Sequence, residues 1–251
     1  MKFKIGGRYL FTKDYDLEGF MEFASEQGFD FVQLGYEAPL KWVGEISKDR
    51  RKRIRMLARR LGLQVCVHSV VNGVNVAWIN RGVREESLRQ IKESIEFTRD
   101  VGAELITVHP GWKDMHGYRY PEEAYALAIE GHIEVADFAA DDGIRIAIEN
   151  MPPGWTSFCV QPGETKAMIE AVGRENAGST LDVGHASILG AEAVGEFITA
   201  LSNRIFIVHM HDNDGQRDQH KALGEGAIDF YHVVGLLGQD GIDAPLCIEA
   251  K

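Results

Sequence analysis

Cysteine is scarce in this sequence, which has only Cys66, Cys159 and Cys247 among its 251 residues. The three are far apart, odd in number and in no C-x-x-C spacing. This pattern indicates neither a disulfide framework nor a thiolate zinc knuckle. We interpret the cysteines as small buried hydrophobic residues of a protein in a reducing compartment.

Basic residues and long apolar runs are also in short supply. Lys and Arg number 27 against 38 Asp and Glu, which gives a formal net charge of −11. Nucleic-acid binding depends on neutralising phosphates with Lys and Arg, so this balance argues against a nucleic-acid partner. No run approaches the roughly 20 apolar residues of a membrane span, and the N-terminal stretch M-K-F-K-I-G-G-R-Y-L lacks the apolar core of a signal peptide. We therefore expect a soluble, cytoplasmic protein without a membrane partner.

What the sequence does contain is an alternation of short apolar runs and amphipathic segments. Strands are predicted at 3–6, 31–34, 63–67, 104–108, 144–148, 179–181, 205–208 and 246–248. Helices are predicted at 17–27, 48–61, 84–101, 122–140, from Pro162 onward, 191–201 and 230–237. This alternation, without a linker, predicts one α/β domain over residues 1–251, a (β/α)₈ TIM barrel that lacks its final helix. A doubly wound sheet would need a Gly-rich phosphate loop after an early strand, and we find none.

The helix predicted at 48–61 is rich in arginine. Its charge run consists of Arg50, Arg51, Arg53, Arg55, Arg59 and Arg60. Such a run is typical of a solvated helix face, so we expect these side chains on the outside of the barrel.

Polar side chains close most of the predicted strands. They are His68, His109, Glu149, Asp182 with His185, His209 and Glu249. In a barrel these positions share the C-terminal face, where the active site lies. A single histidine at a strand end is more often a structural residue than a ligand, but so many coincidences at one level predict a common site.

The segment 204–230 carries the densest group of metal-ligating side chains. Its apolar run 205–208 predicts a buried strand, which is followed closely by His209, His211, Asp212, Asp214, Asp218 and His220. Buried polar and charged groups need partners, and one bound cation would satisfy several of them. The alternative for this segment alone is a solvated acidic loop. The polar residues at the other strand ends favour the metal site.

The order of these residues resembles the xylose isomerase-like barrel superfamily over nearly the whole chain. The matching features are a histidine at strands three and four, E-N at five, L-D-V-G-H at six, H-x-x-D at seven, D-x-H followed by L-G-E-G, and a glutamate at eight. This superfamily includes sugar phosphate isomerases and epimerases, ketose 3-epimerases and endonuclease IV. The resemblance implies a single-metal site of the ketose epimerase type at Glu149, Asp182, His209 and Glu249. A three-zinc site of the endonuclease IV type would add His68, His109, His185, Asp218 and His220. His211 fits neither pattern and is not among the predicted ligands.

The donor atoms indicate which ions would bind. The histidines of the larger set favour zinc, whereas the smaller, oxygen-rich set suits Mn²⁺ or Mg²⁺. Because the larger set is complete, we expect more than one divalent ion per chain, zinc among them.

The implied function is a metal-dependent isomerase or epimerase of a sugar or sugar phosphate, which abstracts a proton beside a carbonyl and passes through an enediolate. In this reading, Glu149 and Glu249 remove and return the proton, and His185 orients a substrate hydroxyl. The predicted apolar walls for the sugar are Trp112, Trp155 and Phe158.

The alternative is an endonuclease IV-like trinuclear zinc phosphodiesterase. Two features count against it: the acidic balance, and the segment S-V-V-N-G-V-N after His68, which lacks the aromatic residue that endonuclease IV uses beside DNA. A catalytically inactive barrel used only for binding is disfavoured by the complete ligand set.

The missing last helix also predicts an assembly. It would leave an apolar flank between the eighth and first strands, and barrel strands are otherwise shielded by helices. We expect another subunit to cover this flank, and hence a homo-oligomer.

Overall fold

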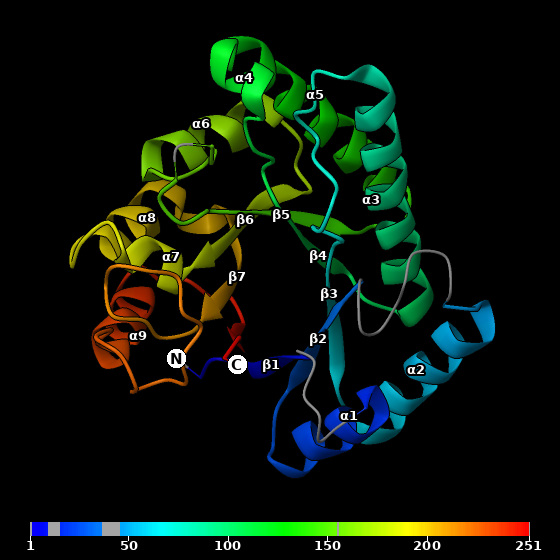
Figure 1. Cartoon of the computed structure of the whole chain (residues 1–251). Helices are drawn as coiled ribbons and strands as arrows, with labels where there is room; N and C mark the ends of the chain where they lie inside the picture. The colour runs from blue at the N-terminus through cyan, green and yellow to red at the C-terminus, as the bar shows by residue number, and fades with distance from the viewer. Residues whose placement is uncertain (1, 10–15, 37–45, 155, 251) are drawn as a thin grey trace.

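Eight parallel strands close into a barrel in the order of the sequence, with β8 returning to pair with β1 (Figure 1). The structure is a computed structural model that describes residues 2–9, 16–36, 46–154 and 156–250. The strands are β1 (Ile5–Tyr9), β2 (Phe31–Gly35), β3 (Gln64–His68), β4 (Leu105–Val108), β5 (Arg145–Glu149), β6 (Ala177–Asp182), β7 (Ile205–Met210) and β8 (Leu246–Ile248). This topology confirms the predicted TIM barrel.

Helices surround the barrel on its outside (Figure 1). They are α1 (Leu17–Glu26), α2 (Lys48–Leu61), α3 (Arg81–Val101), α4 (Met115–Arg119), α5 (Pro121–Ala140), α6 (Pro162–Val172), α7 (Val183–Ser187), α8 (Ala193–Leu201) and α9 (Phe230–Gln239), with a 3₁₀ turn at Ser202–Arg204. In the described chain no helix follows β8, as expected. The short helices α4 and α7 were not predicted.

Side-chain caps explain the differences in helix boundaries. Asp114 and Asp182 each accept a hydrogen bond from the main-chain N–H three residues on, and so begin α4 and α7. Asn80 caps α3 in the same way, so this helix begins at Arg81 instead of at residue 84. Such caps satisfy N–H groups that a helix start leaves unpaired. β1 begins at Ile5, where its pairing with β8 begins.

The interior of the barrel is built in layers. The apolar layer consists of Phe31, Cys66, Leu105, Ala147, Ile207 and Cys247. Nearer the C-terminal end lies a polar layer of Gln33, Thr107 and Thr180, all fully buried. Gln33 donates to the Thr107 hydroxyl at 3.2 Å, and the two threonine hydroxyls lie 3.0 Å apart. These bonds satisfy the buried polar groups and give the functional site a fixed floor.

The prediction of a solvated arginine face was wrong for Arg51. Its side chain is buried, ion-paired with Asp100 at 3.1 Å and close to the rings of Tyr36 and Phe97. A guanidinium stacks well on aromatic rings while its N–H groups bind a carboxylate, so a basic side chain can be accommodated between α2 and α3. Others in the run, such as Arg53, are exposed as expected.

Two further expectations concern burial and membranes. All three cysteines are free and buried, as predicted. None of the helices in the described part of the chain is long and apolar enough to cross a bilayer.

Candidate metal and active site

The strands place the predicted site residues at one end of the barrel. Side chains alternate between the two faces of a strand, so the residue two positions beyond an inward-facing one also points inward. Four such residues follow members of the apolar layer, namely His68, Glu149, His209 and Glu249. Asp182 follows Thr180 of the polar layer in the same way. All five lie at the C-terminal end, where TIM barrels place their active sites.

Histidine and carboxylate side chains gather there in three clusters. Within each cluster the potential ligand atoms all lie within 4.8 Å of one another. The carboxylate cluster is Glu149, Asp182, His209 and Glu249; the two-histidine cluster is His68, His109 and Glu149; the three-histidine cluster is His185, His211, Asp218 and His220. Every predicted ligand therefore belongs to a cluster. The structure adds His211, which the sequence pattern had left out.

His209 lies at the centre of the carboxylate cluster and is fully buried. Its Nδ1 atom is 2.9 Å from Glu149 Oε1, 2.8 Å from Glu249 Oε2 and 3.8 Å from Asp182 Oδ2. Three carboxylates around one imidazole concentrate negative charge away from solvent. Buried charge on this scale is costly unless cations compensate it, and the donor set is consistent with binding of a divalent ion.

The other nitrogen of His209 contacts the polar layer. His209 Nε2 is 3.1 Å from the amide nitrogen of Gln33. In this arrangement the amide donates to Nε2, and Nδ1 carries the proton toward the carboxylates. A cation at Nδ1 would need that lone pair, so the proton would move to Nε2 and Gln33 would rotate its amide to offer an oxygen. Gln33 is therefore the outer partner of a candidate ligand, on the side of His209 that faces away from the carboxylates.

We predict that Gln33→Leu weakens divalent-ion binding at the carboxylate cluster by about 10- to 100-fold, the usual effect of losing an outer-shell partner. The physical reason is that, with an ion on Nδ1, the proton of His209 would lie on the buried Nε2 atom. Leucine offers that N–H no acceptor. Competition with a chromophoric chelator measures the affinity. Gln33→Glu keeps an acceptor oxygen and should lose less. Equal affinities for Gln33→Leu and the unmodified protein would contradict this role.

The two-histidine cluster forms around the second oxygen of Glu149. The Nε2 atoms of His68 and His109 lie 3.3 Å and 3.2 Å from Glu149 Oε2. His68 Nδ1 donates to the main-chain oxygen of Ser69 at 2.9 Å, which leaves the Nε2 lone pair facing the carboxylate. Glu149 thus presents one oxygen to each of two clusters, which is the arrangement of a bridging carboxylate.

Electrostatics hold these groups in forms that bind metals. Burial, and then the positive charge of Arg8, lowers the pKa of His68 to about 3, so this imidazole is neutral at physiological pH. Burial alone would raise the pKa of Glu149, but the neighbouring histidines, His209 first among them, hold it well below its usual range. Neutral imidazole and ionised carboxylate are the forms that coordinate a cation.

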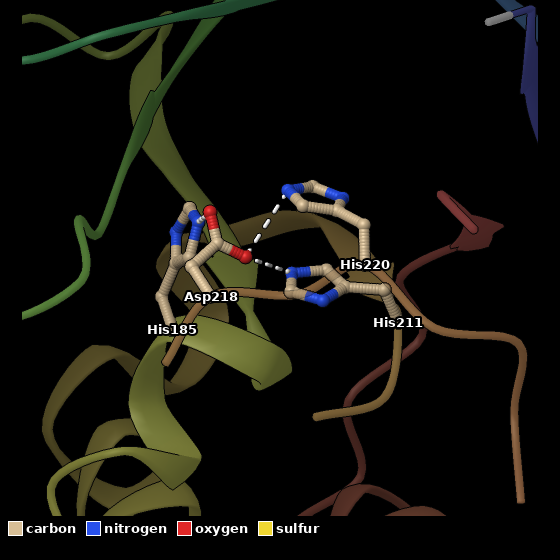
Figure 2. Close-up of side chains that lie close together, drawn as sticks. All are labelled: His185, His211, Asp218 and His220. Atoms are coloured by element: carbon tan, nitrogen blue, oxygen red, sulfur yellow. Dashed lines mark ion pairs between the residues drawn. The ribbon is translucent and has the colours of Figure 1, made fainter. Parts of the chain in front are cut away.

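Figure 2 shows the three-histidine cluster, where His185 of α7 and two histidines of the segment after β7 converge on Asp218. The Nε2 atoms of His220, His185 and His211 lie 3.2, 3.5 and 3.8 Å from the Asp218 oxygens. Burial lowers the pKa of His185 while Asp182 and Asp218 raise it, with the net result of about 10. In the absence of a bound ion, the two carboxylates therefore favour the protonated, positively charged form of His185.

Asn150 arranges two of the clusters, although the sequence analysis gave it no role beyond the E-N motif. Its side chain accepts from the Asp182 N–H at 2.7 Å and donates to the Asp182 carbonyl at 3.0 Å. Its own carbonyl accepts from His185 Nδ1 at 2.8 Å. Asn150 therefore joins the end of β5 to the β6–α7 turn and orients a residue of each cluster.

Asp212 and Asp214 were candidate ligands by their spacing, but both bind main-chain N–H groups. Asp212 accepts from the N–H groups of Asn213, Gly224, Gly226 and Ile228, at 2.8 to 3.2 Å. A Cβ atom at Gly226 would lie 2.2 Å from an oxygen of Asp212, so the L-G-E-G stretch lets the chain wrap closely around this carboxylate. Asp214 accepts from the N–H groups of residues 216 and 217 in a turn.

Arg8 was missed by the sequence analysis. It lies two residues after Gly6 on β1, and its guanidinium is ion-paired with Glu249 Oε1. The sequence did contain a signal for Arg8, because a charged residue within the short strand I-G-G-R-Y indicates a buried partner of opposite charge. Glu249 therefore has one oxygen held by Arg8 and the other beside His209.

Residues 21–251 match the family model described as Xylose isomerase-like TIM barrel. The chain belongs to this family. The identification confirms the resemblance drawn from the strand-end residues.

The relatives of this xylose isomerase-like chain carry different descriptions. An uncharacterized protein from Methanocaldococcus jannaschii is 30% identical over 251 residues, which cover 99% of this chain and 84% of the relative. A probable endonuclease 4 from Mycobacterium leprae is 24% identical over 233 residues, which cover 90% of this chain and 86% of the relative. Among solved structures, a D-tagatose 3-epimerase-like protein matches with a TM-score of 0.89 and 30% identity, over 99% of this chain and 91% of that one.

The predicted sugar walls of this xylose isomerase-like barrel lie in the loops after β4 and β5. Trp112 is half-buried and bridges to Ser157, which brings the two loops together. The ring of Phe158 is buried against Tyr125 and under the ammonium group of Lys113, so packing occupies most of its surface. Trp155 lies outside the described residues.

Proposed function

We propose that the protein is a divalent-metal-dependent epimerase or isomerase of a sugar or sugar phosphate. The observation that carries this proposal is the buried carboxylate cluster, in which Glu149 and Glu249 approach the same imidazole nitrogen. Two carboxylates at one site can remove and return a proton beside a carbonyl. The similarity to a D-tagatose 3-epimerase-like protein at 30% identity supports the same class of reaction.

The residues present fit the metal that this chemistry requires. Glu249 Oε2 lies 2.8 Å from His209 Nδ1 but outside hydrogen-bond geometry, so this buried oxygen has no hydrogen bond within the described ranges. Together with Asp182 and Glu149 it offers oxygen donors beside one nitrogen donor, a set suited to Zn²⁺, Mn²⁺ or Mg²⁺. When bound, such an ion polarises the substrate carbonyl and stabilises the charge of the enediolate.

The proton transfers fall to Glu149 and Glu249. In the proposed mechanism one carboxylate removes the proton from the carbon beside the carbonyl, and the other returns a proton to it. Arg8 positions Glu249 by holding Oε1, which leaves Oε2 directed into the cluster. Both carboxylates are almost fully buried, which limits the access of water to them.

His185 has one nitrogen available for substrate or metal. Its Nδ1 donates to the Asn150 carbonyl, so only Nε2 can orient a substrate hydroxyl or bind an ion. His185 can therefore contact a substrate hydroxyl or bind an ion, but its single available nitrogen cannot do both at the same time.

A trinuclear zinc phosphodiesterase is the second candidate, and the connected clusters favour it. Glu149 belongs to both the two-histidine cluster and the carboxylate cluster. His211 of the three-histidine cluster contacts the carboxylate cluster, because its Nε2 atom lies 3.0 Å from Asp182 Oδ1. Neighbouring ions in such sites activate water and stabilise charge on phosphate. The probable endonuclease 4 among the relatives agrees with this reading. The net charge of −11 opposes it, because a duplex-binding surface is basic.

Two assays on one metal-loaded preparation separate the candidates. Ketoses and ketose phosphates are incubated in D₂O, and NMR follows exchange of the hydrogen beside the carbonyl. Duplex DNA with an abasic site is then tested for nicking. We expect exchange on at least one ketose, no nicking, and no exchange with Glu249→Gln, which serves as a control for contaminating enzymes. Nicking without exchange would replace the proposal by the second candidate.

A further inference from the structure

A cavity of about 300 Å³ lies at the N-terminal end of the barrel, opposite the three clusters. Phe31, Gln64 and Arg145 line this N-terminal cavity, and they are the first residues of β2, β3 and β5. Residues of α2 and of the end of α3 complete its lining. The volume is at the lower end of the range for small-molecule pockets, so the cavity suits a compact ligand.

The charged side chains that line the N-terminal cavity are mostly basic. They are Arg55 and Arg59 of α2, Arg145 of β5 and a single carboxylate, Glu104. Three positive charges and one negative charge leave a net charge of +2, in a chain whose own net charge is −11. Arg55 and Arg59 are four residues apart on one helix, so their side chains are neighbours and repel each other. An anion between them would relieve this repulsion.

The three cavity arginines differ from other arginines of α2 in their partners. Arg51 pairs with Asp100 at 3.1 Å, and its side chain is buried. Arg60 pairs with Glu22 at 3.3 Å. Within the described ranges, none of the three cavity arginines forms an ion pair or a hydrogen bond through its guanidinium group. Their N–H donors therefore remain available to a ligand.

Neighbouring groups hold two of these guanidinium groups in place. The guanidinium carbon of Arg145 lies over the ring of Phe206, 4.8 Å from the ring centre. Stacking uses the flat face of the guanidinium, so the N–H groups in its plane can still donate. Arg55 packs closely against Gly102, where a Cβ atom would lie 2.9 Å from the Nε atom of the arginine. Side chains that are already held lose less freedom when they bind a ligand.

The remainder of the N-terminal cavity offers an apolar surface and one amide. Phe31, Cys66 and Leu105 belong to the apolar layer of the barrel and also line the cavity. Lys4 donates to Gln64 Oε1 at 3.1 Å, so the amide nitrogen of Gln64 remains as a donor. The lining therefore combines donors for an anionic group with a surface for an apolar one.

We propose that the N-terminal cavity binds a compact organic phosphate. Arg55, Arg59 and Arg145 would surround the phosphate group, and the organic part would lie against Phe31 and Leu105. A phosphate monoester carries about 1.5 to 2 negative charges at neutral pH, which matches the net charge of the cavity. Planar guanidinium groups also match the geometry of phosphate oxygens. Because the cavity is at the opposite end of the barrel from the clusters, the proposal does not depend on the proposed function.

The alternative role for these arginines is structural. Basic side chains near a helix C-terminus interact favourably with the helix dipole. Arg59 is in the last turn of α2, and Arg55 lies beside Gly102 at the end of α3. In that role each arginine would contribute to stability alone, and no phosphate would bind.

Isothermal titration calorimetry of the metal-loaded full chain, with inorganic phosphate and with phenyl phosphate, tests the site. We expect phenyl phosphate to bind about tenfold more tightly, because its ring buries apolar surface. Arg55→Gln and Arg145→Gln should each weaken its binding about tenfold or more, the usual cost of losing a hydrogen bond to a charged group. Arg53→Gln is the matched control and should bind normally, because Arg53 is exposed on the same helix and does not line the cavity.

Phosphate that binds to ions at the other end of the barrel would keep its affinity in all these variants, so the comparison with Arg53→Gln isolates the cavity. If circular dichroism shows that Arg145→Gln is unfolded, Arg145→Lys keeps the charge but loses the planar pair of donors, and it should still weaken binding. Equal affinities in the cavity variants and the unmodified protein would overturn the proposal. Equal affinities for the two probes would also overturn it, because the apolar surface would then take no part in binding.

Discussion

Glu149→Gln is expected to abolish turnover and to deplete metal from two clusters at once. The carboxylate contacts His209 through Oε1, and His68 and His109 through Oε2. Glutamine cannot act as the base, and loss of a general base alone costs about 10²- to 10⁴-fold in rate. The loss of a bridging ligand adds to this. Hydrogen exchange with solvent on an active ketose measures the rate, and elemental analysis measures the ions.

Glu249→Gln is the informative comparison. It should also abolish turnover, because Glu249 is the second proton carrier. It should leave the two-histidine cluster intact, because Glu249 belongs only to the carboxylate cluster. Near-normal rates in either variant, on whatever substrate is found, would remove that residue from the mechanism. Equal ion counts in the two variants would show that Glu149 does not bridge.

Removal of divalent ions is expected to lower the melting temperature substantially. An ion that binds only the folded chain, at about 1,000 times its Kd, adds about 4 kcal/mol to the free energy of unfolding. For a domain of this size, 1 kcal/mol corresponds to roughly 2–4 °C, so each ion should contribute roughly 8–16 °C. The reason is that stripping leaves Glu149, Asp182 and Glu249 as buried carboxylates around one imidazole.

Calorimetry of the loaded protein, the chelator-stripped protein and the stripped protein with zinc restored measures this effect. Restoring zinc should recover the original melting temperature. His220→Phe should show a smaller loss on stripping, because it lacks one predicted ligand of the three-histidine cluster. Identical melting temperatures before and after stripping would show that the folded chain holds no tightly bound divalent ion.

The gathering of the predicted ligands at one end of the barrel could be predicted from the sequence, because strand geometry and chain order determine it. His68 and Glu149 are each two residues beyond an inward-facing apolar residue, and in a closed barrel that places them at one end regardless of their separation in sequence. Arg8 and Gln33 could not be recognised in this way. Their roles depend on partners 241 and 176 residues away, and neither partner is indicated by local spacing.

His211 shows where residue spacing stops being informative. Two positions after His209, it would share a face with that residue if the strand continued. β7 ends at Met210, and the chain then turns toward α7, so the two imidazoles enter different clusters. Arg51 shows a similar limit, because a run of like charges does not indicate which member meets a buried carboxylate and two aromatic rings.

The wrapping of residues 213–228 around Asp212 has a consequence for hydrogen exchange. Four main-chain N–H groups donate to this one buried carboxylate, and the predicted ligands Asp218 and His220 lie between these donors in the sequence. Neither Asp218 nor His220 can move far from its cluster unless these hydrogen bonds to Asp212 break. The amides of Asn213, Gly224, Gly226 and Ile228 should therefore exchange together, as one cooperative opening unit. Their common exchange rate would report how often the chain opens wide enough for an ion to enter or leave.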